Sequence, residues 1–83
     1  MYNKRTWLDK PDSSSTGSII AFDGETTWAG VKVKNTFLSI SDSNNSIKLS
    51  SLDDDAIENF KAKLKLLKNE IESFIDHLER THN

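Results

Sequence analysis

The feature that most constrains this chain is a long apolar stripe close to its C-terminus. The apolar residues are separated alternately by three and four positions, at Ile57, Phe60, Leu64, Leu67, Ile71, Phe74 and Leu78. This 3.5-residue repeat predicts an α-helix with one continuous apolar side, which Ile75 widens. We therefore predict a single long helix over residues 52–80.

The predicted start of this helix carries the expected signals. Ser50 or Ser51 can serve as the N-cap, and Asp53–Asp55 place negative charge at the positive end of the helix dipole. Arg80 lies near the other end, where the dipole favours a positive charge.

The segment before the helix has the pattern of short strands. Apolar or alternating runs occur at Ile19–Phe22, Val31–Lys34, Thr36–Ser41 and Ser46–Ser50. Asp42–Asn45 supplies turn residues between two of these runs, which predicts a hairpin over residues 36–49. Two sites, Asp23-Gly24 and Ala29-Gly30, compete for the preceding turn. The prediction is an α+β fold, a small antiparallel sheet of three to five strands over residues 19–50 followed by the helix.

The apolar residues of this sheet do not keep a single phase. If Val31 and Val33 face inward, strict alternation also turns Phe37 inward but sends Leu38 and Ile40 to the other face. Either a bulge near Asn35 resets the phase, or both faces of the sheet are covered. The second alternative implies a partner.

Residues 1–18 read as an N-terminal arm and loop within a single domain of residues 1–83. Arg5–Leu8 is predicted to be an edge strand or a docking arm with Trp7 as its anchor. A cluster of Ser, Thr, Gly and Pro follows and is typical of a loop.

Length predicts that the chain assembles with copies of itself. A helix over residues 53–80 is about 42 Å long, whereas a strand of five or six residues spans about 17–20 Å. The chain has 83 residues and no cysteine, so disulfides cannot supplement a small core. We expect a homo-oligomer, a dimer or higher, with its interface at Leu66, Ile71, Phe74, Ile75 and Leu78.

The sequence contains no motif for catalysis or metal binding. His77 and His82 are five residues apart, which is poor spacing for a shared metal. The segment that begins at Asp42 resembles a calcium loop but has Ile47 where that loop needs glycine. We expect a protein that is not an enzyme and has neither metal nor cofactor. It also has neither a membrane-length apolar run nor a signal peptide, which predicts a cytoplasmic protein without a membrane partner.

Residues 1–50 combine most of the aromatic residues with several cations, although the chain has a net charge of -2. Aromatic faces stack on bases while nearby cations meet phosphates, so this combination favours a small anionic nucleotide as ligand. The serine-rich loop has no P-loop ending but can still offer amides and hydroxyls. The predicted ligand residues are Arg5, Trp7, Ser15, Thr16, Gly17, Ser18, Trp28, Lys32 and Lys48.

Four segments resemble small accessory proteins of tailed phages and prophages of Gram-positive bacteria. They are Tyr2–Leu8, Ser15–Ser18, Phe37–Asp42 and Leu66–Leu78. The resemblance spans most of the chain but carries no catalytic motif. It implies a phage-encoded anti-defence protein in the infected bacterial cell, which sequesters a nucleotide immune signal or blocks a host protein.

A second interpretation comes from the order of elements. A small antiparallel sheet followed by one long helix is similar to the PC4-like coactivators, which dimerise and bind single-stranded nucleic acid with their sheets. The acidic balance of the chain counts against this alternative.

Overall fold

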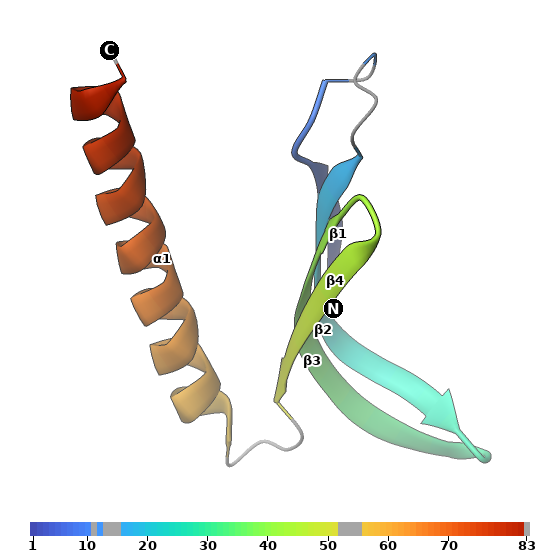
Figure 1. The fold of residues 1–83 in the computed structure, drawn as a ribbon. Coiled ribbons are helices and arrows are strands. Elements are labelled where there is room, and N and C mark those ends of the chain that lie inside the picture. The colour runs from blue at the N-terminus through green and yellow to red at the C-terminus, as the bar shows by residue number, and fades with distance from the viewer. Residues whose placement is uncertain (11, 13–15, 52–55, 83) are drawn as a thin grey trace.

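Four strands precede one helix along the chain (Figure 1), in a computed structural model that describes residues 1–10, 12, 16–51 and 56–82. The elements are β1 (Tyr2–Trp7), β2 (Gly17–Trp28), β3 (Val31–Asp42), β4 (Asn45–Ser51) and α1 (Ile57–Thr81). The strands form one antiparallel sheet in the order β1-β2-β3-β4. The predicted α+β fold is therefore confirmed, and Arg5–Trp7 lies in an edge strand.

The turns of the sheet fall where residues tolerate left-handed backbone. Ala29 and Gly30, at φ angles of 51° and 79°, connect β2 to β3, so this site and not Asp23-Gly24 closes the hairpin. Gly24 lies within β2 and pairs with Asn35. Ser43, at φ 53°, helps to close the predicted hairpin between β3 and β4.

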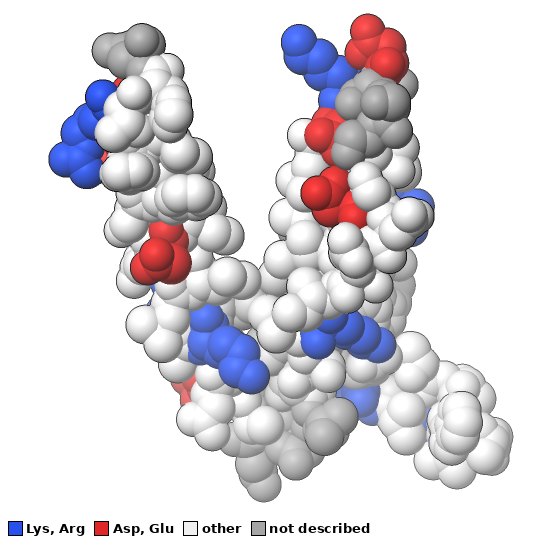
Figure 2. Space-filling model, viewed as in Figure 1, with Lys and Arg blue, Asp and Glu red and all other residues white. Residues whose placement is uncertain are grey.

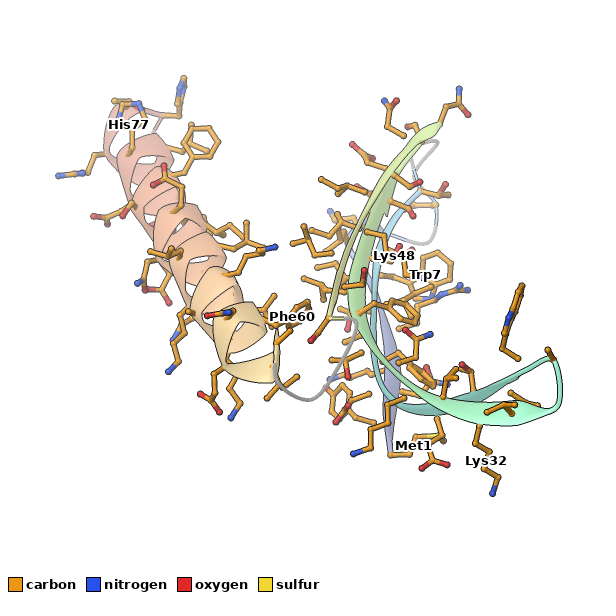
Figure 3. All side chains as sticks on the ribbon, turned by 90° about the horizontal axis from the view of Figure 1, so that it is seen from below. Met1, Trp7, Lys32, Lys48, Phe60 and His77 are labelled. Atoms are coloured by element: carbon orange, nitrogen blue, oxygen red, sulfur yellow. The ribbon has the colours of Figure 1, made fainter. Side chains whose placement is uncertain are left out.

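The pairing of β2 with β3 runs without interruption from Gly17 opposite Asp42 to Trp28 opposite Val31. Of the two alternatives for the phase, a bulge near Asn35 is therefore excluded, and strict alternation divides the sheet into two faces. The inner face, on the side of α1, has an apolar set at Ile19, Ala21, Leu38, Ile40, Ile47 and Leu49. The outer face includes Trp7 and Lys48, which project away from α1 in Figure 3.

The two central strands are longer than the edge strands. β1 pairs with β2 only as far as Asp23, and β4 pairs with β3 only from Thr36 onward. Residues 24–35 therefore form a two-stranded arm, which curves away from the four-stranded part of the sheet (Figure 1).

The start of α1 differs from the sequence-based prediction. Ser50 and Ser51 belong to β4, where Ser51 pairs with Thr36, so neither serine is at the N-cap position of α1. Ala56 occupies the N-cap position and makes no side-chain capping hydrogen bond. The predicted dipole partners Asp53–Asp55 lie outside the described residues.

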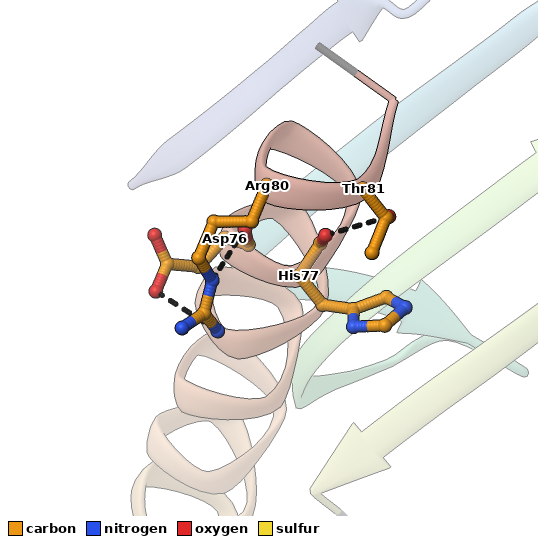
Figure 4. Close-up of polar contacts among 4 residues, drawn as sticks. All are labelled: Asp76, His77, Arg80 and Thr81. Atoms are coloured by element: carbon orange, nitrogen blue, oxygen red, sulfur yellow. Dashed lines mark hydrogen bonds and ion pairs between the residues drawn. The ribbon is translucent and has the colours of Figure 1, made fainter.

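The last turns of α1 are closed by local contacts (Figure 4). Arg80 donates a hydrogen bond through Nε to the Asp76 carbonyl oxygen at 3.3 Å, and its guanidinium lies 3.7 Å from the Asp76 carboxylate. Thr81 donates through Oγ1 to the His77 carbonyl oxygen at 2.8 Å. The side chains of Arg80 and Thr81 thus fold back onto carbonyl groups of the preceding turn, each four residues earlier in α1.

Helix and sheet diverge from a common base, so the molecule is V-shaped (Figures 1 and 2). Among the apolar side chains of the described residues, the one that is buried is Phe60 in the first turns of α1, with 6% of its surface exposed. Further along the stripe, Leu64 and Leu67 are half-buried and Ile71 onward is exposed. The radius of gyration is 15.8 Å, against about 12 Å for a compact domain of this length. No helix within the described residues is long and apolar enough to cross a membrane.

Candidate functional site

The outer face of the sheet has an unusual distribution of charge. The three carboxylates of the four described strands, Asp23, Glu25 and Asp42, all fall on the inner face by the register. On the outer face, Arg5 of β1 and Lys48 of β4 occupy one row across the sheet, joined by Ile20 and Ser39. The outer face is therefore cationic in a chain whose net charge is negative.

Aromatic rings lie beside both cations. The Arg5 guanidinium carbon is 5.4 Å from the centroid of the Trp7 ring, and Lys48 Nζ is 4.3 Å from the centroid of Phe37. Phe37 in turn stacks on Phe22, with centroids 5.4 Å apart and planes 17° apart. These cation–π contacts hold the charged groups over the sheet surface. Trp7 remains 63% exposed, so its ring is accessible to a ligand.

Hydroxyl groups line the end of the outer face next to Trp7. The next row of the register consists of Trp7, Ser18, Ser41 and Ser46. Ser18 was predicted from sequence, whereas Ser39, Ser41 and Ser46 were not. The signal was present, because serines alternate with Leu38 and Ile40 in β3 and must face away from them.

Two of the predicted ligand residues lie elsewhere. Lys32 pairs with Thr27 and lies on the inner-face side of the arm, opposite to Lys48. Trp28 lies on the outer face but ten residues along β2 from Ser18, a separation of about 33 Å in an extended strand. Within one chain, a small ligand that contacts Trp7 does not reach Trp28.

The loop before β2 is closed by a carboxylate. The Gly17 amide donates a hydrogen bond to Asp9 Oδ2 at 2.5 Å, and the Leu8 amide donates to the Gly17 carbonyl oxygen at 2.8 Å. The Gly17 amide thus already donates its hydrogen bond to Asp9, and the Asp9 carboxylate lies where the anionic ligand was expected. Thr16 is exposed, and Ser15 lies outside the described residues.

A hollow of about 620 Å³ lies at the base of the arm, beside the start of α1. Its lining residues are Met1, Asp23, Gly24, Glu25, Lys34, Thr36, Ser51 and Ile57. None of the predicted ligand residues is among them. Asp23 accepts a hydrogen bond from Thr36 Oγ1 at 2.7 Å. The carboxylates of Asp23 and Glu25 outnumber the Lys34 ammonium among the lining side chains, which disfavours a phosphate here. The outer face is therefore the better candidate for an anionic ligand.

The described residues contain no group of three or more His, Asp or Glu side chains that could hold a metal ion. What the outer face offers is cations, hydroxyl groups and aromatic surface, which together suit an anion with a planar ring. Comparison of the chain with protein-family models, with curated proteins and with solved structures finds no match in any of the three.

Proposed function

We propose that this protein is a non-enzymatic, oligomeric binding protein that sequesters a small anionic nucleotide. The nucleotide is an immune signal of a bacterial host, and the protein is an anti-defence factor encoded by a phage and active in the cytoplasm of the infected cell. The resemblance to phage accessory proteins supports this setting. The composition of the outer face supports the ligand class.

The observation that carries the proposal is the segregation of charge across the sheet. Arg5 and Lys48 share the outer face with Trp7, while all three strand carboxylates lie on the inner face. A surface of this kind attracts phosphate through its cations and a base through its aromatic rings. No step of bond breaking is needed, because binding alone removes a signal from solution.

Calorimetric titration with cyclic dinucleotides, ADP-ribose derivatives and short oligonucleotides tests the ligand class. We expect binding of a small nucleotide, and we expect Arg5→Ala and Lys48→Ala each to weaken it about 10- to 100-fold, because each removes a charged contact of about 1.5–3 kcal/mol. Lys4→Ala is the matched control, since Lys4 is next to Arg5 in β1 but on the inner face.

Three outcomes contradict this proposal in different ways. Equal losses for Lys4→Ala and Arg5→Ala would place the ligand somewhere other than the outer face. Binding of no compound in any of the three classes would favour a host protein as the target. Recovery of altered nucleotide after incubation, detected by mass spectrometry, would contradict a non-enzymatic role.

The alternative function is PC4-like binding of single-stranded nucleic acid. It is favoured by one observation, that the outer face presents aromatic and cationic residues on an open sheet. Binding of oligonucleotides alone in the same titrations, with affinity that falls steeply as salt increases, would select it.

A further inference from the structure

Two apolar surfaces of the same chain are left uncovered in the hollow of the V. One is the distal stripe of α1, where Ile71, Phe74, Ile75 and Leu78 are 48%, 59%, 48% and 37% exposed. The other is the distal part of the inner sheet face, where Ile47 is 58% exposed. In Figure 2 the two limbs of the V are mostly white where they face each other.

The base of the V shows that these two surfaces fit each other. Phe60 belongs to the same stripe as Ile71 and Phe74, and it points towards the sheet from α1 (Figure 3). There it is buried, with 6% of its surface exposed, where α1 approaches β4. Beyond this contact the stripe continues along the same side of α1. Its distal part is thus suited to the same kind of sheet surface that covers its first part.

The exposed area has the size that a second copy would cover. The chain exposes 7084 Å², whereas a folded monomer of 9.4 kDa exposes about 5,000 Å². The excess is about 2,000 Å² per chain, or about 4,000 Å² for two chains, which lies within the roughly 2,000–5,000 Å² that obligate homodimers bury.

We propose that the distal stripe of α1 packs on the inner sheet face of a second copy, and that the second copy does the same in return. The contact is isologous, because the stripe of each copy packs on the sheet of the other and the two contacts are identical. A pair formed by the two stripes alone would leave Ile47 and its neighbours on the inner face in water. Reciprocal packing covers the distal stripe and the inner sheet face on both copies.

This arrangement deepens the proposed function and rests on its oligomeric part. It directs the inner faces of both copies towards each other and leaves both outer faces free. Arg5, Trp7 and Lys48 of each copy then remain accessible to a ligand.

Disulfide trapping tests the arrangement, because the chain has no cysteine of its own. Ile47→Cys and Phe74→Cys are prepared as separate full-length variants, refolded together and oxidised. We expect a covalent dimer in the mixture whose peptide map joins position 47 of one chain to position 74 of the other. Glu72→Cys with Ile47→Cys is the matched control, since Glu72 is on α1 but outside the stripe and should give little product.

The outcomes separate this inference from the ligand proposal. A disulfide that forms only between two copies of Phe74→Cys would mean that the stripes pair with each other, and would overturn the inference. A wild-type chain that sediments as a monomer at micromolar concentration would also overturn it. If the 47-to-74 disulfide forms but wild-type protein binds no nucleotide, the arrangement stands and the proposed ligand class fails.

Discussion

Among single residues, two glycines of β2 lead to different predictions although neither has room for a methyl group. A Cβ at Gly17 would lie 2.9 Å from Asp9 Oδ2 and 3.3 Å from Leu8 Cβ, and one at Gly24 would lie 2.8 Å from Met1 Cγ. Met1 is 95% exposed and can move aside, whereas the Asp9 carboxylate accepts the Gly17 amide hydrogen bond. We expect Gly17→Ala to lower the free energy of unfolding by about 1–3 kcal/mol and Gly24→Ala by less than about 0.5 kcal/mol.

Urea denaturation followed by circular dichroism measures both changes at the same protein concentration. Equal losses for the two variants would argue against a structural role for the contact between Asp9 and Gly17.

Single residues also mark where sequence reasoning fails. Ser50 and Ser51 have the chemistry of helix caps, but Ser51 continues the β4 ladder opposite Thr36. The same short segment can either extend the strand or begin the helix, and local propensity does not decide between these two structures. The hydrogen bond from the Gly17 amide to Asp9 could not be predicted from the sequence either, because it joins residues eight positions apart across a loop.

At the scale of elements, the helix was the most predictable part of the fold. Its periodicity over seven apolar positions fixed its type and its apolar side, while its first residue was misplaced. The hairpin of β2 and β3 was harder, because both Asp23-Gly24 and Ala29-Gly30 are turn signals. The pairing that occurs sets Phe22 opposite Phe37 and Ile19 opposite Ile40, and such cross-strand matches are a tertiary property.

The arm of residues 24–35 is predicted to be the least stable part of the sheet. Its two strands have no neighbours, and Trp28 and Val31 at its tip are 76% and 60% exposed. A two-stranded ribbon is marginal in water, so the paired amides of the arm should exchange with deuterium faster than those of residues 18–23 in the same strand. Hydrogen exchange resolved by NMR measures this difference. Equal protection of both parts would mean that a second copy covers the arm.

At the scale of the whole molecule, the predicted difference in length between helix and strands is wrong, because β2 and β3 have 12 residues each and span about 40 Å, about as much as α1. The stripe is nevertheless exposed from Ile71 onward, because α1 diverges from the sheet (Figure 1). The candidate site was predicted in part, since Arg5, Trp7, Ser18 and Lys48 share the outer face. Lys32 lies on the other face and Trp28 lies far along the arm. Residue type predicts what a side chain can bind, but the face it occupies depends on the register, which the ambiguous turn left open.

The shape of the molecule further predicts that its stability depends on its concentration. Phe60 is the one apolar side chain among the described residues that is buried, so a single copy has little core, and the proposed association would supply much of the missing burial. When folding is coupled to dimerisation, a tenfold rise in protein concentration adds about 1.4 kcal/mol to the stability of the folded dimer. The melting temperature should then rise by about 3–6 °C per tenfold concentration.

Differential scanning calorimetry over a hundredfold range of concentration measures this slope. Ile71→Asp should lower the melting temperature and remove the slope, because it places an unpaired charge in the proposed contact. Asn69→Asp adds the same charge on the opposite side of α1 and should keep the slope of the wild-type protein. A melting temperature that does not change with concentration in the wild-type protein would show that one copy is stable alone, and the V would then need no second copy to fold.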